Sequence, residues 1–285
     1  MRFAKGHGTG NDFVILVDPD AGQGLSPALA VRLCDRRTGI GADGVLRAVR
    51  TRAVEAAGVP GGFQLAEWFM DYRNSDGSVA EMCGNGIRVF ARYLAGRGLA
   101  QGPAFAVATR SGVRQVRLED DGTVTAEMGR AAVLGPGRAV IGGRPWDGLR
   151  VSVGNPHLAC LVGMPLAGFD LTVPPELDPA QFPEGGNVEL VLPTGPRALQ
   201  MRVHERGSGE TRSCGTGAVA AAAAAATAAG RDDGTWQVTV PGGQLTVELA
   251  AGASWLGGPA VIVAEGELNP AWLAAADVVA SHGPR

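Results

Sequence analysis

A short motif that occurs twice at a fixed separation constrains this chain more than any other feature. Cys83 begins the segment CGNG, and Cys214 begins the segment CGTG 131 residues later. At the same separation, the segments SGVRQVRL from Ser111 and GGQLTVEL from Gly242 both alternate in polarity after glycine, which is typical of strands. Two matches at one separation indicate an internal repeat.

The repeat predicts an α+β protein of two pseudo-symmetric halves. A length of 285 residues is compatible with this, because a domain commonly has roughly 150 residues. We place the halves at residues 1–130 and 131–285, because the run from Gly129 to Gly143 is rich in glycine. The C-terminal segment is also long enough to cross back to the first half.

Each repeated motif is followed by a predicted helix. The first helix has an apolar stripe, and Arg88 and Arg92 are expected to point elsewhere. The stripe consists of Ile87, Phe90, Ala91 and Leu94. The second helix is almost pure alanine, so strands can approach it on every side, and each half is expected to wrap a β-barrel-like sheet around a central helix. Further helices are expected to begin at Ser26–Pro27 and at Asn269–Pro270.

Composition narrows the class of partner. The 25 basic and 28 acidic residues give a net charge of −3, which removes the electrostatic case for nucleic acid or an anionic membrane surface. The N-terminus lacks the apolar core of a signal peptide, and the alanine-rich run 218–229 is too short to span a bilayer. We therefore expect a cytoplasmic protein that acts on a small molecule, without nucleic-acid or membrane partners.

The two repeated cysteines are placed where a thiol becomes acidic. Unpaired N–H groups and the helix dipole favour the thiolate at a helix N-terminus. The glycines that follow each cysteine open the N–H groups of the first turn to a ligand carboxylate. Each half is therefore expected to supply one reactive thiol and one anion site.

Two thiols on opposite sides of one carbon have a specific chemical use. Inversion of a stereocentre requires a base on one face and a proton donor on the other, and a thiolate and a thiol supply both. If the halves face each other across a cleft, the pattern predicts a racemase or epimerase in which helix N-termini stabilise the carbanion. No cofactor is needed, and Lys5 is the only lysine that could form a Schiff base with pyridoxal phosphate.

The other cysteines are interpreted as structural. Cys34 lies on the apolar face of a predicted helix with Ala30, and Cys160 lies within a strand-like run. They serve as internal controls. No cysteine has a second ligand at short spacing, and the histidines form no paired motif, so a metal site is not expected.

Several polar residues near the repeated motifs are open to two interpretations. An asparagine beside a glycine either forms a turn or binds a ligand. Glu205 and Arg206 form either a surface ion pair or a site for an ammonium and a carboxylate, and His157 is either structural or tunes a thiol. The asparagines are Asn11, Asn74, Asn155 and Asn187.

The sequence resembles the diaminopimelate epimerase family nearly from end to end. The resemblance is carried by five ordered motifs: GHGTGNDFV from Gly6, CDRRTGIGADGV from Cys34, YRNSDGSVAEMCGNGIRVFARYL from Tyr72, GNPH from Gly154 and HERGSGETRSCGTGA from His204. It implies that LL- and meso-diaminopimelate interconvert without a cofactor, in the synthesis of lysine and of peptidoglycan precursors. It also implies the two-barrel fold that the repeat predicts, with the active site between the halves.

The resemblance assigns roles to residues of this chain. Cys83 and Cys214 match the two catalytic cysteines, and His157 and Glu205 match positions that modulate their chemistry. The reacting carboxylate would be held by N–H groups of Gly84, Asn85, Gly215 and Thr216. The distal end of the substrate would be held by Asn11, Asn74, Asn155, Asn187, Glu205 and Arg206.

Two positions depart from the family pattern. Gly44 stands where many members have a glutamine, which removes a side-chain contact with the substrate. The segment 258–264 lacks the tyrosine that contributes to a dimer in many members. A homodimer is expected from the resemblance alone.

Other functions remain to be weighed. A proline or hydroxyproline racemase uses two cysteines, but its ring-shaped substrate would leave the distal polar groups unpaired. A phenazine-type isomerase shares the fold without the cysteine pair. A carboxylate-binding protein has no use for acidified thiols, and a thiol hydrolase leaves the second cysteine unexplained.

Overall fold

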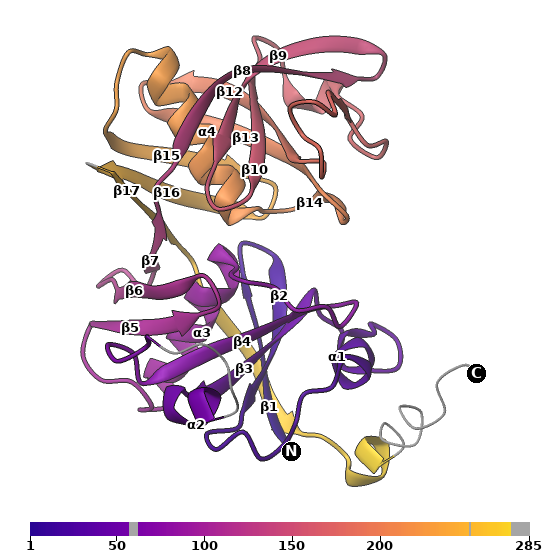
Figure 1. The fold of residues 1–285 in the computed structure, drawn as a ribbon, viewed down its shortest axis with the longest axis vertical. Helices are drawn as coiled ribbons and strands as arrows, with labels where there is room; N and C mark the ends of the chain where they lie inside the picture. The colour runs from indigo at the N-terminus through magenta and orange to yellow at the C-terminus, as the bar shows by residue number, and fades with distance from the viewer. Residues whose placement is uncertain (57–61, 251, 275–285) are drawn as a thin grey trace. The chain divides into compact units, whose positions relative to one another are not determined.

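The computed structural model describes residues 1–56, 62–250 and 252–274, which form two compact units. The first unit comprises residues 1–124 together with the segment that begins at Ala260, and the second comprises residues 125–259. Figure 1 labels the elements of both units. Each unit is an α+β structure with many strands and few helices, as the sequence predicts.

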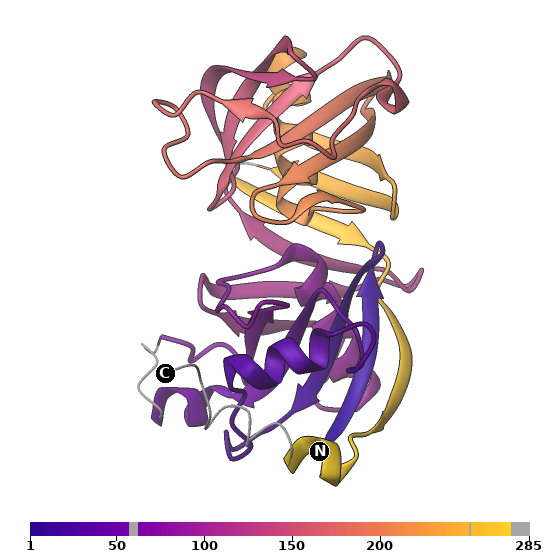
Figure 2. The same ribbon diagram turned by 90° about the vertical axis from the view of Figure 1, so that its right-hand side faces the viewer.

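The first unit has a mixed sheet in the order β18-β1-β2-β3-β4-β5-β6. The β2–β3 and β4–β5 pairs are parallel and the others antiparallel. Figure 2 shows the C-terminal strand β18, in yellow, beside the indigo β1. The elements are β1 Arg2–Gly8, β2 Asn11–Val17, α1 Pro27–Cys34, β3 Gly44–Arg50, α2 Thr51–Ala56, β4 Trp68–Asn74, α3 Gly84–Gly96, β5 Ala104–Thr109, β6 Gly112–Leu118 and β18 Val261–Glu267.

Helix α3 is the central helix of the first unit. It contacts β1, β2, β3, β6 and β18, so strands approach it from several directions. Two glycines of β1 permit this approach. A Cβ atom at Gly6 would lie 2.8 Å from Cγ1 of Val89, and one at Gly8 would lie 3.2 Å from Nη2 of Arg88. The backbone of β1 at these two glycines therefore packs directly against side chains of α3.

The sequence correctly predicts where the two further helices begin. Ser26 caps α1 by accepting the N–H of Leu29 at 3.1 Å, with Pro27 at the first helical position. The described residues of the second expected helix begin at Pro270, and its remainder lies outside the described residues. No helix of the described ranges is long and apolar enough to cross a membrane.

The second unit repeats this plan with a larger sheet. Its pairs include parallel β10–β12 and β13–β15, and antiparallel β8–β9, β9–β10, β12–β13, β15–β16 and β16–β17. The elements are β7 Val124–Gly129, β8 Ala132–Ile141, β9 Arg144–Ser152, β10 Pro156–Leu161, the 3-10 turn Leu166–Gly168, β11 Glu176–Leu177, β12 Asn187–Gly195, β13 Ala198–Glu205, β14 Gly209–Thr211, α4 Gly215–Ala228, β15 Gly234–Val240, β16 Gly243–Ala250 and β17 Ala253–Gly258.

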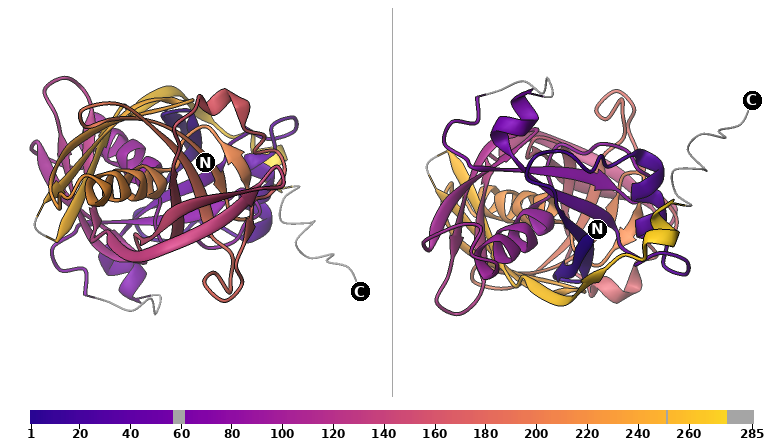
Figure 3. Two further views of the ribbon diagram at one scale, coloured as in Figure 1. Left: turned by 90° about the horizontal axis from the view of Figure 1, so that it is seen from above. Right: turned by 90° about the horizontal axis from the view of Figure 1, so that it is seen from below.

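Helix α4 is buried at the centre of this sheet. It contacts β8, β9, β10, β12, β13, β15, β16 and β17, and Figure 3 shows strands around the orange helix in the view from above. Residues 217–226 are all buried, because alanine leaves no bulky side chain on any face of the helix. The prediction of a sheet wrapped around a central helix is confirmed.

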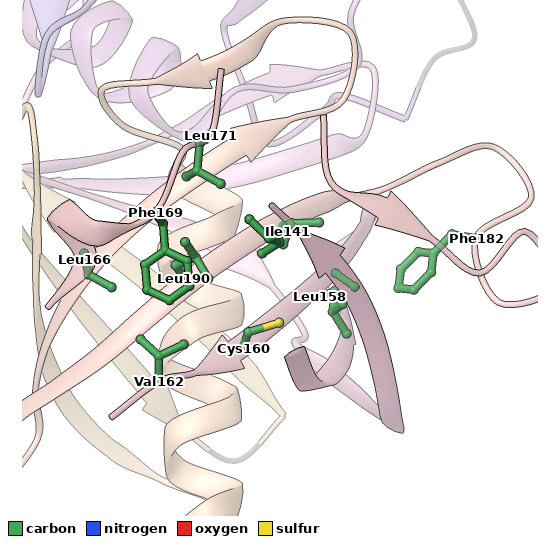
Figure 4. Close-up of a cluster of buried hydrophobic side chains, with 11 residues drawn as sticks. Ile141, Leu158, Cys160, Val162, Leu166, Phe169, Leu171, Phe182 and Leu190 are labelled. Carbon is green, nitrogen blue, oxygen red and sulfur yellow. The ribbon is translucent and has the colours of Figure 1, made fainter. Parts of the chain in front are cut away.

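A second layer of core lies on the other face of β10 and β12. Alternation along each strand sends Leu158, Cys160 and Leu190 to this face, where Phe169 covers them. Figure 4 shows these side chains gathered together. The opposite face of the same strands, which carries His157, Asn187 and Glu189, is directed toward α4.

The internal repeat is also seen in corresponding pairs of parallel strands in the two units. β2 is parallel to β3 with Phe13 opposite Gly44, and β10 is parallel to β12 with His157 opposite Asn187. The predicted strands after Ser111 and Gly242 are β6 and β16. One expectation was wrong: Arg88 does not point away from the core, because its side chain is 0% exposed.

Candidate active site

Cys83 caps the N-terminus of α3. Its backbone is extended, with φ −139° and ψ 122°, and its Sγ accepts the N–H of Gly86 at 3.3 Å. The thiol donates to Oδ1 of Asn11 at 3.7 Å, and Nδ2 of Asn85 reaches the same oxygen at 3.3 Å. Three predicted site residues of the first unit are therefore in direct contact.

A charged cluster behind Asn11 fixes the direction of its amide. Nδ2 of Asn11 donates to Asp43 at 2.8 Å, which turns Oδ1 toward the thiol. Arg36 binds both Asp43 and Asp12, and Lys5 pairs with Asp12 at 2.6 Å. Although burial opposes the shift, hydrogen bonds from Arg36 and Lys5 hold the pKa of Asp12 well below its usual value. The side chain of Lys5, the only lysine of the sequence, is therefore held in this cluster by its ion pair with Asp12.

Cys214 caps α4 in the same way. Its Sγ accepts the N–H of Gly217 at 3.3 Å and lies 3.4 Å from Oγ1 of Thr216. The surroundings differ from those of Cys83, because this thiol is buried near two carboxylates. Burial, followed by the negative charges of Glu205 and Glu189, raises the pKa of Cys214 well above 9.0. The expectation that the helix cap acidifies this thiol is therefore wrong for Cys214, because burial and the two carboxylates outweigh the hydrogen bond from Gly217.

Glu205 lies at the end of β13 beside this thiol. Its Oε1 accepts a short hydrogen bond from the hydroxyl of Thr211. Burial raises the pKa of the Glu205 carboxyl above 4.5, while hydrogen bonds from Thr211 and the thiol of Cys214 act in the opposite direction. A carboxyl with a raised pKa next to a thiol is suited to exchange a proton with it.

A continuous polar chain connects Cys214 to the buried pair of His157 and Glu189. Thr216 accepts from Nδ2 of Asn155 at 3.4 Å, and Oδ1 of Asn155 lies 3.0 Å from Nε2 of His157. Nδ1 of His157 lies 2.6 Å from Oε1 of Glu189, and both side chains are 0% exposed. With Glu189 on Nδ1, the amide direction of Asn155 decides whether Nε2 donates or accepts.

The remaining predicted residues lie at the ends of strands: Asn74 ends β4, Asn187 begins β12 and Arg206 follows β13. Oδ1 of Asn187 accepts the backbone N–H of Arg206 at 2.9 Å, and the Arg206 guanidinium donates to the carbonyl of Glu184 at 3.0 Å. Arg206 therefore has a partner other than Glu205. In the first unit, Nδ2 of Asn74 donates to Oγ of Ser78 at 2.9 Å, within a turn that follows β4.

The two internal control cysteines differ from the helix caps in their hydrogen bonds and not in the direction of the pKa, since burial also raises the pKa of Cys214. Burial raises the pKa of Cys34 to about 11 and that of Cys160 to about 12. Neither sulfur accepts a hydrogen bond from a helix N-terminus among the contacts of the described residues. Within those residues no group of three or more His, Cys, Asp or Glu side chains could hold a metal ion.

Gly44 is explained by packing. A Cβ atom there would lie 2.6 Å from the carbonyl oxygen of Arg73 and 2.6 Å from Cε2 of Tyr72. Any side chain would therefore displace the neighbouring strand or the tyrosine ring. The surroundings of Gly44 therefore fit a glycine, which is the residue that departs from the family pattern at this position.

Sequence reasoning missed two buried charges, Arg88 and Glu189, which are both 0% exposed. The repeat contains a signal for the first, because it aligns Arg88 with Val219 in a helix that is apolar on all sides. A signal for the second is its position two residues after Asn187 in an otherwise apolar strand. Both patterns predict that the charged side chain is buried, but neither predicts which group it contacts.

The model of the diaminopimelate epimerase family matches residues 3–134 and 149–269. The diaminopimelate epimerase of Thermobifida fusca (strain YX) is 59% identical over 271 residues, covering 94% of this chain and 98% of that protein. The diaminopimelate epimerase of Mycolicibacterium smegmatis is 53% identical, covering 95% and 98%.

Solved structures of low identity share the fold. A phenazine biosynthesis protein from Bacillus anthracis has a TM-score of 0.67 at 15% identity, covering 94% of this chain and 99% of that chain. A hydroxyproline epimerase from Agrobacterium vitis has a TM-score of 0.64 at 16% identity, covering 97% and 98%. At these identities the likeness extends to the fold alone.

Proposed function

Because this chain belongs to the diaminopimelate epimerase family and is an isomerase, we propose that it moves one α-proton between Cys83 and Cys214. We take the substrate pair to be LL- and meso-2,6-diaminopimelate, as the family resemblance implies, and the relatives are named diaminopimelate epimerases. The observation that carries the proposal is the matched capping geometry. Each sulfur accepts the N–H of a glycine three residues on, at 3.3 Å, on the central helix of its own unit.

The proposed reaction balances without a redox partner. One cysteine thiolate removes the α-proton, so the carbon–hydrogen bond breaks and a sulfur–hydrogen bond forms. The electron pair is delocalised into the α-carboxylate, and the other thiol delivers its proton to the opposite face. First-turn N–H groups, which a helix cannot satisfy internally, stabilise the extra negative charge. In this proposal they belong to Gly84, Asn85, Gly215 and Thr216.

The other site residues are proposed to act around this step. His157 and Glu205 modulate the thiols, since each lies in the polar surroundings of Cys214. The groups proposed to hold the distal amino-acid end of the substrate are the side chains of Asn11, Asn74, Asn155, Asn187, Glu205 and Arg206. No cofactor enters this mechanism.

The assembly and the location also belong to the proposal. We propose a cytoplasmic homodimer, as the family resemblance implies. Strand β18 offers exposed apolar side chains for an interface, at Val261 and Val263. Sedimentation equilibrium of the full chain measures this directly, and a monomer at micromolar concentration would remove the dimer from the proposal.

The reaction is tested in deuterated water with LL-diaminopimelate and freshly reduced enzyme. Deuterium at the α-carbon together with formation of the meso isomer is expected, and both are lost in Cys83→Ala and in Cys214→Ala. Cys34→Ala is the matched control, because Cys34 is as buried as Cys214 but lies at the C-terminal end of α1 and caps no helix N-terminus. Undiminished turnover in either cap variant would contradict the two-thiol mechanism.

A further inference from the structure

A carboxylate at the start of the parallel pair β2–β3 holds the amide of Asn11. Nδ2 of Asn11 donates to Oδ2 of Asp43 at 2.8 Å, and the backbone N–H of Asp12 donates to the same oxygen at 3.1 Å. Nη2 of Arg36 donates to the other oxygen, Oδ1, at 2.7 Å. Both oxygens of Asp43 therefore act as acceptors, as those of an ionised carboxylate do.

The acceptors on Asp43 determine which way the Asn11 amide points. An amide turned by 180° keeps its shape, so only its partners decide whether oxygen or nitrogen faces a given side. Because a carboxylate oxygen offers no hydrogen to accept, the NH2 group of Asn11 must face Asp43. The carbonyl oxygen of Asn11 lies on the other side, where the Cys83 thiol donates to it at 3.7 Å and Nδ2 of Asn85 at 3.3 Å.

The second unit contains a related asparagine, Asn155. It directly precedes β10 by one residue, and two residues further on lies His157, which pairs in parallel with the next strand at Asn187. In the first unit the residue two after Asn11 is Phe13, which likewise begins the parallel pairing of β2 with β3. Asn155 therefore occupies the position of Asn11 in the repeat.

The carboxylate has no counterpart in the second unit. Gly186 directly precedes β12 as Asp43 directly precedes β3, so the repeat places a glycine where the first unit has the aspartate. A Cβ atom at Gly186 would lie 2.8 Å from Cδ1 of Phe182. Any side chain there would displace the phenylalanine ring, so a carboxylate does not fit at this position.

Asn155 is turned the opposite way. Its Nδ2 donates to Oγ1 of Thr216 at 3.4 Å, and its Oδ1 lies 3.0 Å from Nε2 of His157. Thr216 is the counterpart of Asn85, 131 residues further along the chain. The two related asparagines therefore offer opposite groups to the first turn of the central helix, because Asn11 accepts there and Asn155 donates.

We propose that Asp43 is a positioning residue of the epimerase, which fixes the Asn11 amide with its oxygen toward the Cys83 thiol and so orients the S–H bond. The proposal rests on the proposed function and deepens it, because Asp43 is outside the set of groups proposed to contact the substrate. Proton transfer requires a defined direction of the S–H bond and of the sulfur lone pairs. A fixed acceptor beside the sulfur limits the directions that the S–H bond takes.

The surroundings of Asp43 keep its carboxylate in place. The backbone N–H of Asp43 donates to the carbonyl of Asp12 at 2.9 Å and to its side chain at 3.2 Å. Nη2 of Arg36 bridges the carboxylates of Asp43 and Asp12, and Lys5 pairs with Asp12 at 2.6 Å. Asp43 is therefore fixed to the start of β2 by backbone and side-chain bonds, and it does not follow a rotation of the Asn11 amide.

The test replaces Asp43 by asparagine and follows alkylation of Cys83 by iodoacetamide, by mass spectrometry, from about pH 6 to 9. Arg36 retains the remaining oxygen of residue 43, so the new NH2 group faces Asn11 and makes its amide turn. The Cys83 sulfur then faces an N–H group, which favours the thiolate. Asp43→Asn is expected to move the alkylation profile of Cys83 to lower pH by roughly half a unit to one unit, which is about three- to tenfold faster alkylation at pH 7.

The same substitution in an Asn11→Ala background separates positioning from charge. Removal of the Asp43 charge acts on the thiol through space whether or not Asn11 is present. If Asp43 acts through the amide, Asp43→Asn should leave the Cys83 profile unchanged in a chain that already carries Asn11→Ala. Asp35→Asn is the matched control, because Asp35 lies in the same loop between α1 and β3 but accepts from the N–H groups of Arg37 and Thr38.

Two results would overturn the proposal: a wild-type profile of Cys83 in folded Asp43→Asn, or a shift that is equally large in the Asn11→Ala background. Cys34 and Cys160, which are buried, report in the same sample whether a variant has opened the fold.

If Asp43→Asn does not fold, nuclear magnetic resonance of the wild-type chain decides. The side-chain amide signal of Asn11 should follow the titration of the Asp43 carboxyl, and an amide signal that does not follow it would count equally against the proposal. None of these measurements requires turnover. A failure of the positioning role is therefore distinguishable from failure of the epimerase mechanism, which the deuterium experiment decides.

Discussion

At the scale of single residues, the burial of Glu205 that suits it to the proposed proton transfer also lowers the stability of the folded chain. Burial raises the pKa of its carboxyl, so the ionised form is disfavoured in the folded chain relative to the unfolded chain. The folded state then binds more protons than the unfolded state above pH 4.5, and its stability falls as the pH rises through the raised pKa.

Glu205→Gln should therefore flatten the dependence of unfolding free energy on pH. As the pH rises above about 5, the wild-type chain is expected to lose stability relative to the variant, by on the order of 1 kcal/mol for each unit of pKa shift. Urea unfolding over a series of pH values measures this. Glu184→Gln is the control, because the Glu184 carboxylate is 87% exposed and lies 3.7 Å from Arg206. Parallel profiles of wild type and Glu205→Gln would contradict the assignment.

The residues of the candidate site were predictable to different degrees. Cys83 and Cys214 follow from the repeat, since helix caps are set by local sequence. The polar chain from Cys214 to His157 was not predictable in detail, because it depends on which faces of β10 and β12 meet α4. Arg88 was misplaced because a charged side chain on a helix is ordinarily solvated, and its burial depends on long-range packing.

At the scale of elements, close approach of strands to the central helices explains part of the high glycine content. The apolar stripe of α3 and the alanines of α4 predict helices at the centres of sheets, because periodicity is local. The glycines of β1 that let α3 approach were not predictable, since they matter only once helix and strand meet. A Cβ atom at Gly6 would lie 2.8 Å from both Cγ1 of Val89 and the carbonyl oxygen of Val261.

Gly6→Ala should therefore destabilise the first unit by about 1–3 kcal/mol, as overpacking does. Gly96→Ala is the matched control at the far end of α3, where nothing lies within 4 Å of the added atom. This control is expected to be neutral or to gain up to about 1 kcal/mol from helix propensity. Thermal unfolding followed by circular dichroism compares them. Equal unfolding midpoints for the two variants would show that β1 shifts to accommodate the added methyl group without loss of stability.

At the scale of the whole molecule, the chain crosses between its units twice. It leaves the first unit after Val124 and returns at Ala260, where β18 adds to β1 with Glu267 opposite Arg2. Trp272 then packs near α1, where Arg32 lies 4.4 Å from its ring centroid and its indole N–H donates to Thr38. The repeat indicates two halves, but only the pairing of β18 with β1 shows that the first unit is discontinuous in sequence.

This discontinuity predicts how fragments of the chain fold. Residues 125–259 expressed alone should unfold cooperatively, whereas residues 1–124 alone should not, because β1 loses the partner of its outer edge. Since Glu267 lies opposite Arg2 and the N–H of Leu268 donates to the carbonyl of Met1, a short glycine-rich linker from Leu268 to Met1 should restore folding in the permuted chain 260–268 then 1–124. Thermal unfolding monitored by circular dichroism distinguishes the three fragments. An unfolding midpoint of 1–124 equal to that of the permuted chain would mean that β18 contributes an interface rather than stability, and its exposed Val261 and Val263 would then be the first residues to test.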